Sequence, residues 1–370
     1  MTINQLVFFE LLRAGLWKKE ARLSQYKDID YSAIMKLAEE QFVVGLITAG
    51  LEYVSDVKVP KEVLLQFIGS TLQIEQQNKA MNEFVAWIID LLRKQDVYSL
   101  LVKGQGIAQC YEKPLWRASG DVDLYLSESY YQKAKSFLAP LASNVEKEDE
   151  KRLHLGMTIN SWIVELHGTM HSDYSIKVNK GLDDVHRCVF YGGEVRSWDN
   201  GGVTILLPSA DNDVIIIFTH ILQHFFVEGI GLRQICDWCR LLWTYRDKID
   251  MRLLEKRLKY MGLMSNWKAF AALAVDWLGM PAEEMPLYNK SRSWKEKGNR
   301  IIVLILDTGN FGHNRDMSYK QTDTYFVRLA KSFNRRNKDA FRQFMIFPLD
   351  TLRMWWKMFL MGIGVAFKGR

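Results

Sequence analysis

The sequence predicts an α+β fold, in which a small mixed β-sheet core is flanked by N- and C-terminal α-helical regions. Three observations support this prediction. Apolar residues recur at helical spacing at the start of the chain, short apolar runs bounded by turn residues follow, and helical spacing returns after Pro208. We therefore expect three regions: an N-terminal helical region (1–95), an α/β core (96–207) and a C-terminal helical region (208–370).

Composition and charge exclude several classes of protein. The chain has 370 residues, 48% of them hydrophobic and 25% charged, with only 7 prolines, which excludes collagen-like and disordered chains. The net charge of +6 is too small to indicate a nucleic-acid binder by itself. The charge is unevenly distributed, because residues 291–370 hold 16 Lys or Arg against 6 Asp or Glu. The C-terminal end is therefore the basic end.

Cysteine usage and hydropathy indicate a cytoplasmic protein. Cys236 and Cys239 form one C-x-x-C, but it lies in an apolar helical run with no second pair at zinc-site spacing, so we expect two buried helix thiols. The start of the chain lacks the pattern of a secretory signal, and no run of about 18 apolar residues predicts a spanning helix. We therefore expect the protein to lie in the reducing cytoplasm, with membrane association as a further possibility.

The elements of the core follow from its apolar runs and turn signals. A turn at Asn160-Ser161 predicts an antiparallel pair, and a serine at 127 or 129 suits the cap of the helix that follows the second strand. The predicted strands are 97–102, 122–126, 153–159, 162–167 and a late edge strand at 203–207. The predicted helices of the C-terminal region include 214–226, 232–243, 251–261 and 267–278.

Two aspartates on the second predicted strand are the first candidates for chemistry. The run is Gly-Asp-Val-Asp-Leu-Tyr-Leu, residues 120–126. Because side chains alternate along a strand, Asp121 and Asp123 share one face while Val122 and Leu124 point to the other. Paired carboxylates suit Mg²⁺, which takes one or two of them together with substrate phosphates. A D-x-D pattern alone also fits an exposed strand with two solvated acids. The neighbouring motifs are therefore needed to decide between this alternative and a metal site.

A third acid lies on a later strand. Glu165 stands between Val164 and Leu166, and a carboxylate embedded in an apolar strand is costly unless it is paired or binds metal. If this strand lies beside the first, Glu165 becomes a third metal ligand or a general base, as phosphoryl transfer requires. The alternative is an edge-strand glutamate that faces water.

A glycine-rich turn joins the first strand to a short helix at 107–111. Its sequence is Val-Lys-Gly-Gln-Gly, residues 102–106. Glycine lets the backbone approach a phosphate, and the N–H groups at a helix start can bind one. The turn contains neither the Walker A pattern nor G-x-G-x-x-G, and an ordinary strand-to-helix turn fits it equally well.

The order of these motifs resembles a family of uncharacterised bacterial nucleotidyltransferases within the polymerase-β-like superfamily. The resemblance rests on Leu-Val-Lys-Gly-Gln-Gly from Leu101, then Tyr111, Pro114 and Arg117, then the strand with the two aspartates. The later Val-Glu-Leu-His run resembles the family's acidic strand, and the segment from His220 to Asp237 resembles its following helices. The likeness covers residues 40–245 and is specific through its order.

The resemblance implies a Mg²⁺-dependent nucleotidyltransferase that binds an NTP, with ATP the expected nucleotide, and moves its NMP to an acceptor hydroxyl. It implies that the metal ligands and catalytic acids are Asp121, Asp123 and Glu165. It also implies that Gly104 is the glycine of a nucleotide-binding turn that includes Gln105. Lys103 and Arg117 are further candidates for contacts to the nucleotide phosphates, because their charges flank the acids in the sequence. Gln105 departs from the superfamily pattern, which has serine there, so a hydroxyl contact to phosphate is lost. Salt bridges to the same acids are the alternative role of Lys103 and Arg117.

Two further features concern partners. His220 and His224 share one helix face, where the surrounding apolar residues indicate packing, although His220 would reach a cleft if the helices closed over the core. The tail at 341–370 mixes aromatic and aliphatic residues with cations, as an interfacial helix on an anionic membrane does. A terminal helix docked on the core is the alternative for the tail.

Three functions remain open at this stage. The first is the nucleotidyltransferase, whose acceptor is a small molecule, a protein side chain or an RNA end. The second is a catalytically silent module that binds a nucleotide or a partner, which the missing serine favours and the three acids oppose. The third is a membrane-surface protein of polysaccharide assembly, which depends on the tail.

Overall fold

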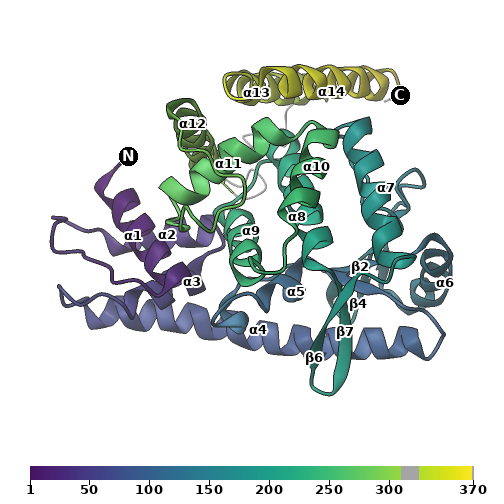
Figure 1. The fold of residues 1–370 in the computed structure, drawn as a ribbon, viewed down its shortest axis with the longest axis horizontal. Coiled ribbons are helices and arrows are strands. Elements are labelled where there is room, and N and C mark those ends of the chain that lie inside the picture. Colours follow the sequence, from purple (N-terminus) through teal and green to yellow (C-terminus); the bar gives the residue numbers. More distant parts are fainter. Residues whose placement is uncertain (310–324, 369–370) are drawn as a thin grey trace.

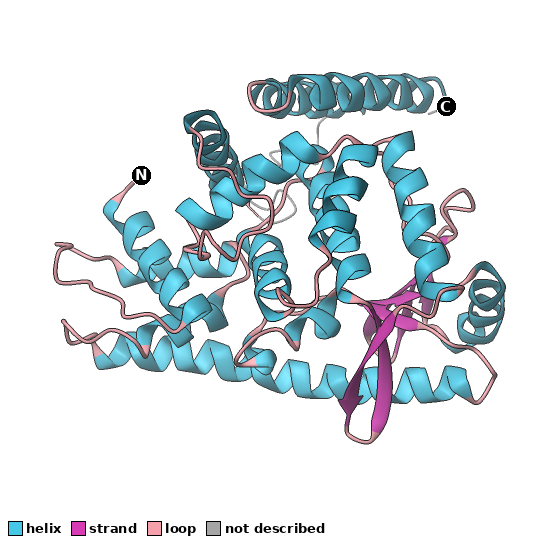
Figure 2. Cartoon of the chain, in the orientation of Figure 1, coloured by secondary structure: helices cyan, strands magenta, loops and turns pink. Residues whose placement is uncertain are grey.

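The computed structural model describes residues 1–309 and 325–368 and has the expected mixed α+β architecture (Figures 1 and 2). Helices precede and follow one sheet, so the predicted fold class is confirmed. The helices before the sheet are α1 (Ile3–Trp17), α2 (Tyr31–Glu40), α3 (Val44–Leu51) and α4 (Lys61–Arg93). At 33 residues, α4 is about 50 Å long and runs beneath much of the molecule in Figure 1.

The middle of the chain forms the sheet and the short helices around it. The strands are β1 (Leu100–Val102), β2 (Val122–Tyr125), β3 (Asn144–Val145), β4 (His154–Ile159), β5 (Trp162–His167), β6 (Val195–Asn200) and β7 (Val203–Pro208). The helices are α5 (Gly104–Ala108), α6 (Glu128–Leu138) and α7 (Ile176–Phe190), with 3-10 turns at Pro114–Trp116 and Ala139–Leu141. Ser127 caps α6 by accepting a hydrogen bond from the backbone N–H of Tyr130, as the sequence predicted.

The regular elements described after the sheet are all helices, joined by turns and loops. Its helices are α8 (Ala210–Val227), α9 (Leu232–Thr244), α10 (Met251–Met261), α11 (Met264–Asp276), α12 (Arg292–Thr308), α13 (Tyr325–Phe344) and α14 (Pro348–Lys368). The four helices predicted between residues 214 and 278 are therefore confirmed. Whether the three predicted regions fold as separate domains stays a prediction.

The seven strands form one mixed sheet in the order β3-β4-β5-β2-β1-β7-β6. The hairpins β4–β5 and β6–β7 are antiparallel, as is the pair β1–β2. β2 runs parallel to β5, and β1 runs parallel to β7. The parallel contact between β2 and β5 brings the two acidic strands together.

The prediction that strand 203–207 lies at the edge of the sheet is wrong. This strand, β7, lies between β1 and β6, and β6 forms the edge. The sequence of β6, Val-Arg-Ser-Trp-Asp-Asn, is mostly polar, and each of its residues is exposed or half-buried. No apolar pattern was therefore present to reveal it.

The two faces of the sheet have different environments. On one face, apolar residues of β2 and β5 pack with the second half of α4 and with α6, in a cluster that includes Val122, Leu124, Val164, Leu166 and Ile88. The opposite face is covered by α5 and the helices after the sheet. Polar side chains on that opposite face are thus enclosed between the sheet and the helices.

Burial decides the role of the C-x-x-C pair. Cys236 and Cys239 are fully buried in α9, as predicted, and burial raises the pKa of both thiols.

Within residues 1–309 and 325–368, no helix combines the length and the apolar character needed to cross a bilayer. The predicted tail is described as far as Lys368, and residues 369 and 370 lie outside the described part.

The contact between α1 and α3 depends on two glycines. A Cβ atom on Gly15 would lie 2.0 Å from the carbonyl oxygen of Leu46, and one on Gly50 would lie 2.0 Å from that of Leu11. Neither carbonyl can move without disturbing its own helix. The close approach of these helices therefore requires glycine at both positions.

We predict that Gly50→Ala lowers the free energy of unfolding by at least about 2 kcal/mol, because the added methyl group forces the two helices apart. Gly69→Ala is the matched control, since a Cβ atom there meets nothing within 4 Å and alanine favours a helix interior. Urea unfolding of both variants measures the difference. Equal stability of the two variants would contradict the assignment.

Candidate functional site

The three predicted acids meet on one face of the sheet. Asp123 on β2 is paired directly with Glu165 on parallel β5, and Asp121 precedes β2 by one residue. Strand alternation places Asp121 on the same face as Asp123. One carboxylate oxygen from each of the three side chains lies within 4.8 Å of the others. The acids of two separate strands therefore form one cluster.

Lys103 provides a positive charge at this cluster. It follows β1 and precedes α5, with a left-handed φ of 56°. Its Nζ atom lies 2.6 Å from Oδ1 of Asp123. Burial alone would lower the pKa of Lys103, but the charges of Asp123, Glu165 and Asp121 outweigh burial and raise it. The ammonium group is therefore charged and faces the acids.

Two histidines flank the acids on the same face. His167, two residues after Glu165, is paired across the strands with His154 on β4 and with Tyr125 on β2. Its Nε2 atom lies 2.8 Å from Oδ1 of Asp123 and 3.4 Å from Oε2 of Glu165. Nε2 of His154 lies 3.3 Å from the same glutamate oxygen. The acids thus have polar partners on both sides.

The acids differ in how readily they ionise. Repulsion by Asp123, together with burial, raises the pKa of Asp121. Burial would also raise the pKa of Asp123, but Lys103 and His167 lower it overall. For Glu165, hydrogen bonds from His154 and His167 outweigh burial and lower the pKa. Asp123 and Glu165 are therefore ionised at neutral pH.

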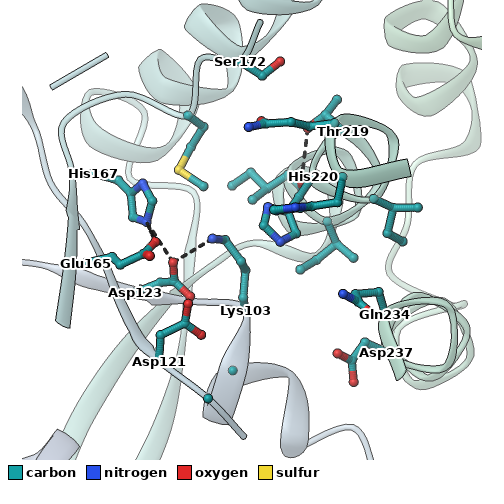
Figure 3. A pocket seen from close by; sticks show the side chains of 18 of the residues that line it. Lys103, Asp121, Asp123, Glu165, His167, Ser172, Thr219, His220, Gln234 and Asp237 are labelled. Atoms are coloured by element: carbon teal, nitrogen blue, oxygen red, sulfur yellow. Dashed lines mark hydrogen bonds and ion pairs between the residues drawn. The ribbon is translucent and has the colours of Figure 1, made fainter. Parts of the chain in front are cut away.

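A cavity of about 400 Å³ opens in front of this cluster (Figure 3). Its floor is formed by the acids and Lys103, and its walls come from α8, α9 and the loop after β5. Figure 3 shows Thr219 and His220 on one helix and Gln234 and Asp237 on another, across from the acids. Gly104 lines the cavity with a φ of 38° and exposes backbone to it. The site lies between the sheet and the C-terminal helices.

Arg117 lines the cavity but is held by a buried ion pair. Its Nε and Nη2 atoms donate to the two oxygens of Asp237 on α9, at 2.9 and 2.7 Å. The hydroxyl of Tyr111 donates to the same carboxylate at 2.7 Å. Arg117 is therefore not bridged to the acids of the sheet. The pair instead fixes the loop after α5 to α9.

Gln105 points away from the cavity. Its side chain is 2% exposed, and its Nε2 atom donates to Oδ1 of Asn78 on α4 at 3.2 Å. It is absent from the residues that line the cavity. Its backbone N–H remains the group through which this residue could contact a phosphate.

Several cavity residues were missed or misjudged from the sequence. Arg233 on α9 lines the cavity and donates to the carbonyl of Ala118, and Arg152 lines it and pairs with Asp173. Neither has a motif, because each lies in a segment whose local pattern indicates a helix or a loop. The sequence favoured a packing role for His220 and offered a position in a cleft as the alternative. The structure places His220 in the lining of the cavity. Burial and the charge of Lys103 hold its pKa well below the ordinary value, so its imidazole is neutral.

Comparison with known families decides the kinship of the chain. A family model described as an uncharacterised nucleotidyltransferase matches residues 27–279, which contain the sheet, α4 and the helices that line the cavity. The chain belongs to this nucleotidyltransferase family. No curated protein and no solved structure matches the chain. Membership supports a transferase that uses a nucleoside triphosphate, in agreement with the sequence resemblance.

The donor set of this nucleotidyltransferase fits a divalent metal. Three carboxylates converge on one point, and the positive charge of Lys103 does not balance them. Oxygen ligands of this kind suit hard cations such as Mg²⁺. Asp121, Asp123 and Glu165 are therefore the residues that could hold such an ion.

We predict that Asp237→Ala lowers the free energy of unfolding by about 3–5 kcal/mol, because it leaves the buried guanidinium of Arg117 without its carboxylate. The matched control is Glu52→Ala, which removes an exposed pair with Lys113 and should cost less than about 1 kcal/mol. Thermal and urea unfolding measure both. A loss below about 1 kcal/mol for Asp237→Ala would contradict a structural role for the pair.

Proposed function

We propose that the protein is a Mg²⁺-dependent nucleotidyltransferase that transfers an NMP group from an NTP to an acceptor hydroxyl. The supporting observation is the meeting of Asp121, Asp123 and Glu165 on adjacent parallel strands at the floor of a cavity. In the reaction, the acceptor oxygen bonds to the α-phosphorus and the bond from that phosphorus to the β-phosphate oxygen breaks. Pyrophosphate leaves with the electron pair of the broken bond, and the proton of the acceptor hydroxyl passes to solvent water.

The three carboxylates have one main task in this proposal, which is to hold Mg²⁺ beside the phosphates. When bound, Mg²⁺ supplies charge stabilisation for the attacking and the leaving oxygen. Glu165 is assigned to ion binding rather than to proton removal, because its lowered pKa makes it a weak base. Asp123 is likewise ionised and ready to bind a cation.

The cations of the cavity are the proposed contacts to the triphosphate. Lys103 lies at the acids, and Arg117 and Arg233 line the wall beside them, each donating to the carbonyl of Ala118. Guanidinium groups bind phosphate oxygens through several donors at once. At Gly104 and Gln105 the proposed contacts come from backbone N–H groups. ATP is the expected donor nucleotide.

The acceptor site is proposed on the helical side of the cavity. Gln223, His224 and Thr219 on α8 face the space opposite the sheet, together with the loop of Thr169 and Ser172 after β5. These groups suit a hydroxyl-bearing acceptor, since they offer both donors and acceptors of hydrogen bonds. A small molecule, a protein side chain and an RNA end all remain acceptor classes.

We predict that Asp123→Asn lowers transfer from an NTP by at least about a hundredfold, because the removed charge holds the ion. The assay incubates the full-length protein with each α-labelled NTP, Mg²⁺ and a cell lysate, and follows label transfer and pyrophosphate release. Filtration, protease and nuclease treatment then separate the three acceptor classes. Omission of Mg²⁺ should have the same effect as the substitution.

Asp247→Asn is the matched control, because this aspartate is 88% exposed and is not among the residues that line the cavity. Nucleotide binding is measured in parallel by calorimetry. Transfer that persists in Asp123→Asn would refute the assignment of the acids. Binding without transfer in the unaltered protein would favour the catalytically silent module instead.

A further inference from the structure

We propose that His154, His167 and Glu165 form a second metal site, which binds a divalent transition ion through two imidazole nitrogens and one carboxylate oxygen. The site shares Glu165 with the proposed Mg²⁺ ligands and adds two residues that the proposed transfer reaction does not use. It depends on the proposed function only through this shared residue. Its three donor atoms lie within 4.8 Å of one another.

The register of the strands builds this site. β4 and β5 are antiparallel, with His154 directly opposite His167. Glu165 is two residues before His167 and therefore lies on the same face of the sheet. The imidazole centroids are 4.8 Å apart. All three ligands thus come from one rigid hairpin rather than from mobile loops.

The distances match those around a transition ion. Nε2 of His154 and Nε2 of His167 lie 3.3 and 3.4 Å from the same oxygen, Oε2 of Glu165. Ligands at about 2.0–2.1 Å from a tetrahedral ion lie about 3.3 Å from one another. Both imidazoles therefore already have the spacing from the carboxylate that such an ion requires.

The donor types select the ion. Two imidazoles and one carboxylate are ligands of zinc and of non-haem iron, whereas Mg²⁺ prefers oxygen alone. All three residues line the cavity, so an ion can enter and keep an open position for water or substrate. The two ligand groups are therefore expected to differ in metal preference, with a transition ion at the histidines and Mg²⁺ at the aspartates.

Cobalt titration of the metal-free, full-length protein tests this site, because Co²⁺ bound by nitrogen ligands in a low coordination number has strong visible absorption. We expect one equivalent to bind, with Zn²⁺ displacing it and a large excess of Mg²⁺ failing to do so. His154→Ala should weaken binding at least about tenfold. His171→Ala is the matched control, since His171 lines the same cavity but lies outside the cluster.

The outcomes separate this proposal from the proposed function, because the titration contains no nucleotide. Asp121→Asn should abolish transfer and leave the cobalt spectrum intact, since Asp121 is outside the histidine site. Equal cobalt affinity in His154→Ala and in the unaltered protein, both shown to be folded by circular dichroism, would overturn the second site. Displacement of Co²⁺ by an equal concentration of Mg²⁺ would also overturn it.

A different part of the molecule carries an independent inference. Helices α13 and α14 pack side by side as a C-terminal hairpin, and the indole Nε1 of Trp355 donates to Oδ1 of Asn337 between them (Figure 1). From residue 341 to 360, seven large apolar side chains of this hairpin are 38% or more exposed: Phe341, Phe344, Met345, Leu349, Leu352, Trp356 and Leu360. We call these residues the apolar strip.

We infer that the apolar strip docks on an anionic membrane surface. Leu349, Leu352, Trp356 and Leu360 recur at three- and four-residue steps and therefore share one face of α14. Residues 336–360 hold five Lys or Arg against two Asp, and three of these cations form ion pairs: Arg342 with Asp307, Arg353 with Asp350 and Lys357 with Asp173. An anionic surface is therefore inferred from the net excess of cations in this segment. Apolar residues beside cations are the chemistry that binds the interface of an anionic leaflet without crossing it.

Vesicle sedimentation tests this surface with the full-length protein. We expect the protein to pellet with phosphatidylglycerol vesicles and to remain in solution with phosphatidylcholine vesicles. Leu349→Glu, at a position 77% exposed, should lower the bound fraction at least about tenfold. Leu65→Glu is the matched control, because Leu65 is 59% exposed on α4, on the other side of the molecule (Figure 1).

Three outcomes would overturn the membrane surface. Equal pelleting with both vesicle types would remove the role of charge. An equal effect of Leu65→Glu would remove the role of the hairpin. A dimer in sedimentation equilibrium that Leu349→Glu dissociates would identify a second copy of the chain as the occupant of the strip.

Discussion

The parallel pairing of β2 with β5 is the constraint on which the site depends. It sets Asp123 opposite Glu165 on one face of the sheet. The apolar residues that alternate with these acids along β2 and β5 pack against α4 and α6 on the other face. A slip of β5 by one residue would turn Glu165 into the apolar core and its apolar neighbours Val164 and Leu166 into the cavity. The burial of the apolar face therefore fixes the position of the acids, and α4 contributes to the site without lining the cavity.

Much of the fold was predictable because its pattern is local. Helical spacing indicated α8 to α11, and strand alternation placed Asp121 and Asp123 on one face. The edge strand β6 escaped prediction because its residues are half exposed and polar. The edge position assigned to 203–207 was wrong for the same reason. Register between strands is a long-range property, which the sequence of either strand alone does not specify.

The residues of the candidate site also divide into those that the sequence indicated and those that it did not. The acids, Lys103 and Gly104 lie in motifs whose order is specific, so the sequence indicated all of them. The partner of Arg117 was not predictable, since Asp237 is 120 residues away and meets it only after α9 has packed on the sheet. Arg152 and Arg233 carry no local signal at all. Residues contributed by helices to a shared cavity are revealed by tertiary packing rather than by sequence pattern.

The ion pair between Lys103 and Asp123 bears on how the protein would acquire a metal ion. Small zinc domains stay unfolded until their metal arrives, because metal binding supplies the free energy that folds them. Here an ammonium group of the chain lies 2.6 Å from Asp123, which is 2% exposed, and supplies a counter-charge to it. The buried acid therefore has a counter-charge within the folded chain itself. The ion of the proposed reaction would have to exchange for this contact, so its binding would release Lys103 towards the cavity.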